Sequence, residues 1–177
     1  AMIEYLYEKS EDYEQVDKPY VGNPENGELL VSSYGCMGCH QIQPEEDPDY
    51  IPSMQNIRLE QGPNLIGLGS KTNEKWLFNW LKNPYSYHPG TKMPNMRLSD
   101  EEASDIAAYL IQGKTTEFDE TPVPSVNQDI LNEITSDFLS QLNSTSQVAQ
   151  KLESMSVEEK LSYSGKNLIG HYGCYSC

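Results

Sequence analysis

The sequence has 177 residues, a net charge of −15 and a mean hydropathy of −0.65, with 37% hydrophobic residues. A chain of this length forms one or two small domains, and a core with so few apolar residues is expected to need disulfides, a metal or a cofactor. The 27 acidic and 12 basic residues argue against a nucleic-acid-binding protein, which needs a basic surface, and against docking on anionic lipid.

Residues 1–20 are acidic and rich in tyrosine and show no clear hydrophobic period, which indicates an N-terminal extension. A helix is predicted from Pro24, because Asn23 is a good capping residue and proline suits the first helical position. This helix should end directly before Cys36. Residues 41–62 contain proline and acidic residues and few apolar ones, so they are predicted to form a long loop.

Two further helices are predicted between residues 71 and 113. Lys71–Lys82 carries its apolar residues on one face, whereas the proline-rich residues 84–97 are predicted to be irregular. Ser99 and Glu102 form a capping box, which predicts a second helix that ends near Gly113.

The C-terminal third is predicted to begin with a linker and to continue as helices. Residues 115–125 have the composition of a linker, and residues 126–142 repeat apolar side chains at helical spacing over about four turns. Residues 143–155 are rich in serine and glutamine and weakly helical. Ser156 and Glu159 match a second capping box, which opens the last segment.

An internal repeat links the two ends of the predicted helical region. The pattern Tyr-Gly-Cys-x-x-Cys at residues 34–39 recurs at residues 172–177, an offset of 138 residues between Tyr34 and Tyr172. The match extends upstream through three pairs: Gly27 and Gly165, Leu30 and Leu168, and Val31 and Ile169. The last residues therefore resemble the opening of a second copy of the first domain.

The four cysteines form two C-x-x-C pairs, and only the first is followed by histidine. Cys36 and Cys39, three positions apart, can each bond one vinyl group of a haem, and His40 is then held beneath the iron as a ligand. The alternative is a thiol redox or zinc-binding pair without haem. A zinc site shared with Cys174 and Cys177 is disfavoured, because such pairs usually lie about 15 to 20 residues apart.

Several stretches in a fixed order resemble class I cytochromes c over residues 23–113. They are the helix before Cys36-Met37-Gly38-Cys39-His40, then Gly62-Pro63-Asn64-Leu65, then Pro89-Gly90-Thr91-Lys92-Met93-Pro94, and then Leu98-Ser99-Asp100-Glu101-Glu102-Ala103. The resemblance implies an all-α cytochrome c fold, a covalent haem c and electron transfer. The stretch between His40 and Pro63 is longer than is usual in the family, which implies an inserted loop.

The resemblance also implies roles for individual residues. Met93 is expected to be the sixth iron ligand, with Met96 and His88 as competitors, and the Pro63 carbonyl is expected to accept a hydrogen bond from the proximal histidine. Trp80 resembles the residue that hydrogen-bonds a haem propionate. The first and last helices of the domain should cross at Gly27 and Tyr109, while Trp76 is expected to be an ordinary core residue.

The predicted organisation is an acidic extension (1–20), a class I cytochrome c domain (21–114), a linker with an amphipathic helix (115–155) and the truncated start of a second haem domain (156–177). Cys174 and Cys177 would belong to a second haem site without its histidine. A dihaem peroxidase is the enzymatic alternative, although a haem with both axial positions filled has no open site for substrate.

The sequence also suggests partners and a compartment. Residues 71–97 hold five basic residues and one acidic residue, and in class I cytochromes such a patch steers acidic redox partners. A domain or partner of a membrane respiratory complex is expected. Because bacterial haem attachment occurs outside the cytoplasmic membrane, we expect a periplasmic or otherwise extracytoplasmic protein.

Overall fold

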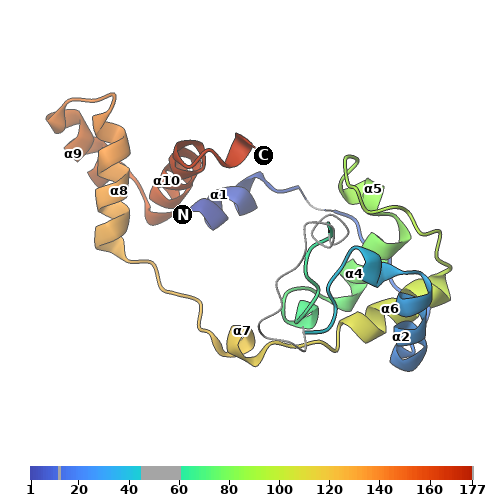
Figure 1. Cartoon of the computed structure of the whole chain (residues 1–177). Coiled ribbons are helices and arrows are strands. Elements are labelled where there is room, and N and C mark those ends of the chain that lie inside the picture. Colours follow the sequence, from blue (N-terminus) through green and yellow to red (C-terminus); the bar gives the residue numbers. More distant parts are fainter. Residues whose placement is uncertain (12, 45–60, 177) are drawn as a thin grey trace. The chain divides into compact units, whose positions relative to one another are not determined.

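The computed structural model of the chain describes residues 1–11, 13–44 and 61–176 (Figure 1). Throughout these described ranges the regular elements are helices and no strand occurs, so the all-α prediction is confirmed. No helix in them is long and apolar enough to cross a membrane. The chain forms two compact units. One comprises Tyr13–Pro122, and the other combines Ala1–Asp12 with Val123–Cys177.

The Tyr13–Pro122 unit contains the stretches that resemble cytochrome c. Its elements are α2 (Pro24–Ser33), η1 (Cys36–Gly38), η2 (Leu68–Ser70), α4 (Glu74–Lys82), α5 (Pro84–Tyr87), α6 (Asp100–Leu110) and α7 (Thr116–Glu120). The predicted irregular stretch and the predicted linker thus each contain one short helix. The predicted long loop falls largely in residues 45–60, which lie outside the described residues.

The helix starts follow the predicted caps. The Asn23 side chain accepts a hydrogen bond from the backbone N–H of Asn26, and Ser99 and Glu102 form the complete capping box of α6. The α4 helix begins later than predicted from the pattern, because Asn73 caps it by accepting from a backbone N–H in its first turn. These local bonds satisfy N–H groups that a helix end otherwise leaves without a partner.

The core of this unit lies where α2 and α4 pack against α6. At the α2–α6 crossing, a β-carbon on Gly27 would lie 2.1 Å from the carbonyl oxygen of Asp105 and 2.8 Å from the β-carbon of Tyr109. Only glycine allows this approach. The predicted crossing of Gly27 and Tyr109 is therefore observed. The core residues are Val31, Leu77, Phe78, Leu81, Leu98, Ala103, Ile106, Ala107 and Leu110.

Residues before α2 attach to α4 by backbone and side-chain bonds. Asn79, which is buried, accepts from the backbone N–H of Val16 at 3.0 Å and donates to the carbonyl of the same residue at 2.8 Å. Asp17 pairs with Lys75 at 2.6 Å. The second half of the predicted extension is thus tied to α4 by the same kind of amide pairing that joins two strands.

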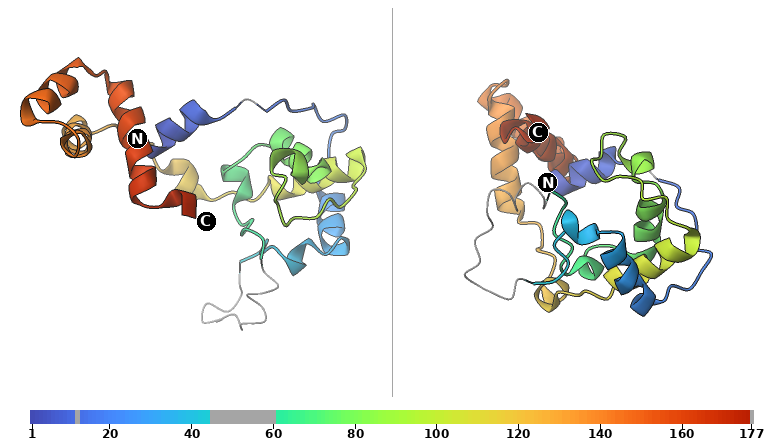
Figure 2. Two further views of the ribbon diagram at one scale, coloured as in Figure 1. Left: turned by 90° about the horizontal axis from the view of Figure 1, so that it is seen from above. Right: turned by 45° about the vertical axis from the view of Figure 1, so that its right-hand side comes forward.

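The second unit contains α1 (Met2–Lys9), α8 (Gln128–Ser140), α9 (Thr145–Ser154), α10 (Val157–His171) and η3 (Cys174–Ser176). The α10 helix begins at the predicted capping box of Ser156 and Glu159. It packs against α8, where the buried hydroxyls of Thr135 and Ser164 share a hydrogen bond of 2.9 Å. It also packs against α1, and both views in Figure 2 show these two helices side by side.

The predicted domain boundaries remain a prediction, and one feature of the structure differs from them. Residues 1–20 were expected to form one extension, whereas Ala1–Asp12 belongs with the C-terminal residues and Tyr13 begins the other unit. The physical reason is that α1 contacts α10 closely, a pairing that local sequence patterns do not reveal.

Candidate haem site

The first cysteine pair lies on the turn that ends α2. The helix is followed by Gly35 in the left-handed region with φ of 71°, and η1 begins at Cys36. Glycine adopts this conformation without steric cost. Cys36 is half-buried and Cys39 is exposed, and both thiols are free. Burial raises the pKa of the Cys36 thiol, which therefore stays protonated at neutral pH.

His40 is oriented by the segment that follows the undescribed residues. Its Nδ1 lies 2.8 Å from the carbonyl oxygen of Pro63, which can only accept, so Nδ1 carries the proton and Nε2 is free to bind a metal. The ring also lies against Gly62, where a β-carbon would come within 2.4 Å of its Cε1. Backbone on one side and a hydrogen bond on the other therefore fix the imidazole.

Met93 lies partly buried against the core, and its thioether has a defined partner. The indole N–H of Trp80 donates to the Met93 Sδ, with an N–S distance of 2.9 Å. The predicted hydrogen bond from Trp80 to a propionate stays a prediction. The sequence did not reveal the contact with Met93, because the two residues lie 13 positions apart and meet only through the path of the chain between them.

Trp80, the partner of this methionine, belongs to a cluster of four aromatic rings. Trp76 and Trp80 stack with ring centroids 5.5 Å apart, and Tyr87 packs against both of them. Tyr13 stacks on Tyr87 at 3.9 Å. The Tyr87 hydroxyl is buried and has no hydrogen-bond partner within the described part of the chain, and burial raises the pKa of this hydroxyl. The sequence did not indicate that Tyr87 packs on Trp80 or that Tyr13 stacks on Tyr87.

The competing ligands occupy different surroundings. Met96 packs partly buried against the same core as Met93, so burial alone does not separate the two methionines. His88 is exposed. In the other unit, Cys174 is exposed and follows a glycine with φ of 67°, while Cys177 lies outside the described residues. Among described residues, no group of three or more His, Cys, Asp or Glu side chains is arranged to hold a metal ion.

The residues around His40 and Met93 fit a porphyrin. Neither cysteine is joined in a disulfide, and the histidine presents one free nitrogen. A porphyrin also needs apolar surroundings that shield its faces from water. The half-buried apolar side chains that pack on the same core as Cys36 and Met93 are Leu30, Tyr34, Ile42, Leu65, Leu68, Trp76, Met96 and Tyr109.

The basic patch predicted over residues 71–97 is partly neutralised. Lys75 pairs with Asp17 at 2.6 Å, and Lys82 pairs with Asp100 at 2.8 Å. The other three cations, Lys71, Lys92 and Arg97, are exposed and form no ion pair with any described residue. The net positive surface is therefore smaller than the sequence count indicates.

Comparison with known proteins identifies the class of this domain. The family profile described as cytochrome c matches residues 24–114. Cytochrome c of Tetrahymena pyriformis is 34% identical over 84 residues, covering 42% of this chain and 75% of that protein. Cytochrome c of Ginkgo biloba is 27% identical over 107 residues, covering 54% of this chain and 93% of that protein.

A larger protein also matches. Cytochrome c oxidase subunit 2 of Bacillus subtilis is 30% identical over 94 residues, which are 48% of this chain but only 24% of that subunit. No solved structure gives a significant match. The chain belongs to the cytochrome c family. Membership implies a covalently bound haem c and electron transfer with redox partners.

Proposed function

We propose that residues 24–114 carry single electrons through one haem c whose iron is bound by His40 and Met93. The observation that carries this proposal is the bond between the His40 Nδ1 and the Pro63 carbonyl at 2.8 Å. It fixes the tautomer and the ring orientation that an iron-binding imidazole needs, and it raises the basicity of Nε2. Cys36 and Cys39 would hold the haem through thioether bonds.

The surroundings of Met93 support its role as the second axial ligand. A thioether sulfur has two lone pairs, so it can accept the Trp80 N–H and still offer one pair to iron. When bound, the haem supplies a one-electron Fe(III)/Fe(II) couple, and methionine ligation raises its potential. With His40 and Met93 both bound, no axial position is open to substrate, which suits a carrier or relay module.

The test compares two methionine variants of the haem-loaded chain. Met93→Leu should abolish the weak red absorption band that methionine-to-iron ligation produces in the oxidised protein and should lower the potential. Met96→Leu, the matched control on the same loop, should keep both properties. Loss of the band in Met96→Leu alone would assign the ligand to Met96, and a chain that binds no haem after expression with haem-maturation machinery would refute the proposal.

The proposed setting is a respiratory chain outside the cytoplasmic membrane. The match to an oxidase subunit supports a role near such a complex. Redox protein partners, acidic at their contact surface, would dock near Lys71–Arg97, where Lys71, Lys92 and Arg97 remain unpaired within the described ranges. Export before haem attachment gives a periplasmic or otherwise extracytoplasmic location.

Small redox reagents can test this docking surface. Oxidation by anionic hexacyanoferrate(III) should slow as salt is added, because the local positive patch attracts the reagent and salt screens it. The total charge of −15 alone predicts the opposite dependence. Lys92→Gln should weaken the salt effect, whereas Lys75→Gln, at a paired lysine, should change it less. A rate that rises with salt would contradict the proposed patch.

We also propose that Cys174 and Cys177 belong to a second haem site. The support is the match of α10 and η3 to α2 and η1: both helices end in a capping tyrosine of similar backbone angles, and a left-handed glycine follows each. Addition of one histidine after Cys177 should raise the haem content, measured as the pyridine haemochrome, from one to two per chain. A content that stays at one would refute the second site.

A further inference from the structure

The α10 helix reproduces the packing of α2 as well as its sequence. Ile169 and Val31, which are equivalent in the repeat, are both 3% exposed. Gly165 and Gly27 are likewise equivalent, and both are buried in their respective helices. In α2, α6 crosses so closely over Gly27 that a larger residue at this position would collide with it. The same residue in α10 therefore predicts that a helix with the role of α6 crosses α10 at Gly165.

The helix that crosses α10 at this position is α1. A β-carbon on Gly165 would lie 2.4 Å from the carbonyl oxygen of Ala1 and 2.8 Å from the β-carbon of Tyr5. At Gly27 the corresponding atoms are the carbonyl oxygen of Asp105, at 2.1 Å, and the β-carbon of Tyr109, at 2.8 Å. Each glycine thus meets a backbone oxygen and, four residues later in the same helix, the β-carbon of a tyrosine.

The sequence of α1 agrees with this equivalence. Aligning Tyr5 with Tyr109 also aligns Leu6 with Leu110. In the cytochrome c domain Leu110 is 7% exposed, because it belongs to the core between α6 and α4. Leu6 is 56% exposed. The α1 helix therefore presents an apolar side chain at a position where the equivalent helix in the other unit is covered.

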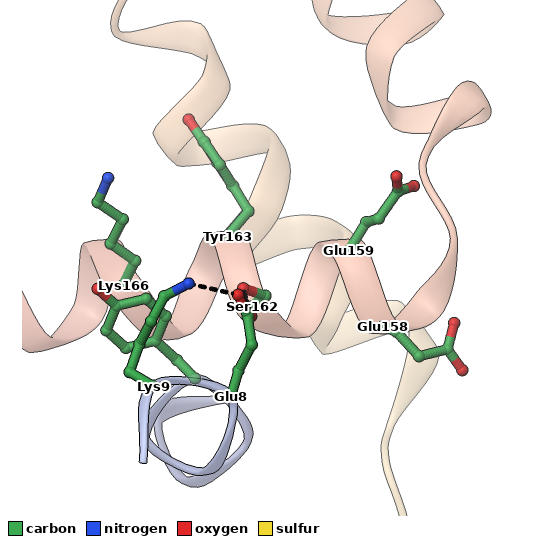
Figure 3. Close-up of a pocket in the computed structure, with 8 residues that line it drawn as sticks. Glu8, Lys9, Glu158, Glu159, Ser162, Tyr163 and Lys166 are labelled. Carbon is green, nitrogen blue, oxygen red and sulfur yellow. Dashed lines mark hydrogen bonds and ion pairs between the residues drawn. The ribbon is translucent and has the colours of Figure 1, made fainter. Parts of the chain in front are cut away.

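The α1–α10 crossing is seen along the axis of α1 in Figure 3, with α10 running across the view. Side chains from both helices surround the crossing, including Glu8 and Lys9 of α1 and Lys166 of α10. Lys9 and the Ser162 hydroxyl both donate to the Glu8 carboxylate. The bond from Lys9, and then the bond from Ser162, lower the pKa of Glu8. A hydrogen bond between the two helices, from Ser162 to Glu8, thus accompanies the close approach of α1 to Gly165.

From these contacts we infer that α1 is the closing helix of a second haem domain, in which α10 is the helix that leads to the cysteine pair. Residues 1–9 then have the role that α6 has in the first domain, and they stabilise the helix end that presents Cys174. The inference rests on the proposed second haem site for its function, but the helix pairing itself is independent of haem binding. In this inference α1 and α10 of the same chain pair with each other.

Hydrogen exchange measured by mass spectrometry on the haem-loaded chain tests the pairing. The chain is exported with a leader that is cleaved before Ala1, so that Ala1 is present at the contact with Gly165. Within residues 2–9, the amides from Tyr5 onward should exchange slowly, because Tyr5 donates the first backbone bond of α1, to the Ala1 carbonyl. Gly165→Ala adds only the β-carbon that meets a backbone oxygen, and it should speed their exchange by about tenfold.

Gly170→Ala is the matched control, because the same change on the same helix meets no atom within 4 Å. It should leave the exchange of residues 2–9 within about twofold of the parent. Removal of residues 1–9 is the reciprocal test and should speed exchange in α10 around Gly165. This second variant gives a result even if Gly165→Ala perturbs α10 itself.

Three outcomes would overturn the inference: fast exchange of residues 2–9 in the parent, equal effects of the two alanine variants, or protection that disappears on dilution. The last result would mean that α1 pairs with α10 of another copy. The haem content of the same samples reports the proposed function separately. Protected helices with one haem per histidine-extended chain would refute the second haem site alone.

Discussion

Replacement of Gly27 by alanine places a methyl group where α2 crosses α6. The new β-carbon would lie 2.1 Å from the carbonyl oxygen of Asp105, whereas ordinary contact begins at 3.4 Å. Because the obstructing atom is backbone, the helices must separate by roughly 1.3 Å, the difference of these distances. Such overpacking costs about 3 kcal/mol, and the better helix propensity of alanine returns about 1 kcal/mol.

The expected net loss in the free energy of unfolding is therefore about 2 kcal/mol. Urea unfolding of the haem-loaded chain, followed by far-UV circular dichroism and by the Soret band, measures it. Gly113→Ala is the control, because its nearest neighbouring atom would lie at 3.6 Å, and it should stay within about 0.5 kcal/mol of the parent. Equal stability of the two variants would refute the argument that this crossing requires glycine.

Three further predictions follow from bonds of the same domain. Asp105→Ala should lower the free energy of unfolding by about 2 kcal/mol, measured by urea unfolding, because it removes the acceptor of two 2.6 Å bonds from the start of α2. Trp80→Phe should keep the ring packing but shift the haem potential in a voltammetric titration, because the Met93 Sδ loses its donor; an unchanged potential would contradict this. The bonds from the Ser99 N–H and then the Tyr34 hydroxyl lower the pKa of Glu102 from its ordinary value of 4.5. The stability that this carboxylate contributes is therefore complete above that value and is lost as the pH falls below it, so the urea midpoint of Glu102→Gln should depend less on pH in this acid range.

Local signals in the sequence predicted much of the helical framework. The caps at Asn23, Ser99 and Ser156 each begin a helix as expected, because a cap depends on side chains within one turn of the helix end. The predicted start of α4 lies three residues too early, because Asn73, which falls inside the predicted helix, is its cap. The order of motifs around Cys36 was sufficient to predict the family.

The amino-acid sequence by itself therefore determined the family, the helix starts after Asn23, Ser99 and Ser156, and the residues proposed to bind haem. Only the tertiary structure decided that the Trp80 N–H meets the Met93 sulfur, that Val16 pairs with the Asn79 amide, and that α1 belongs with α10. The residues that meet in these contacts are 13, 63 and more than 150 positions apart. Hydrophobic periods and capping motifs describe only a single helix, so pairings between segments that lie so far apart in the chain are fixed by packing and not by local pattern.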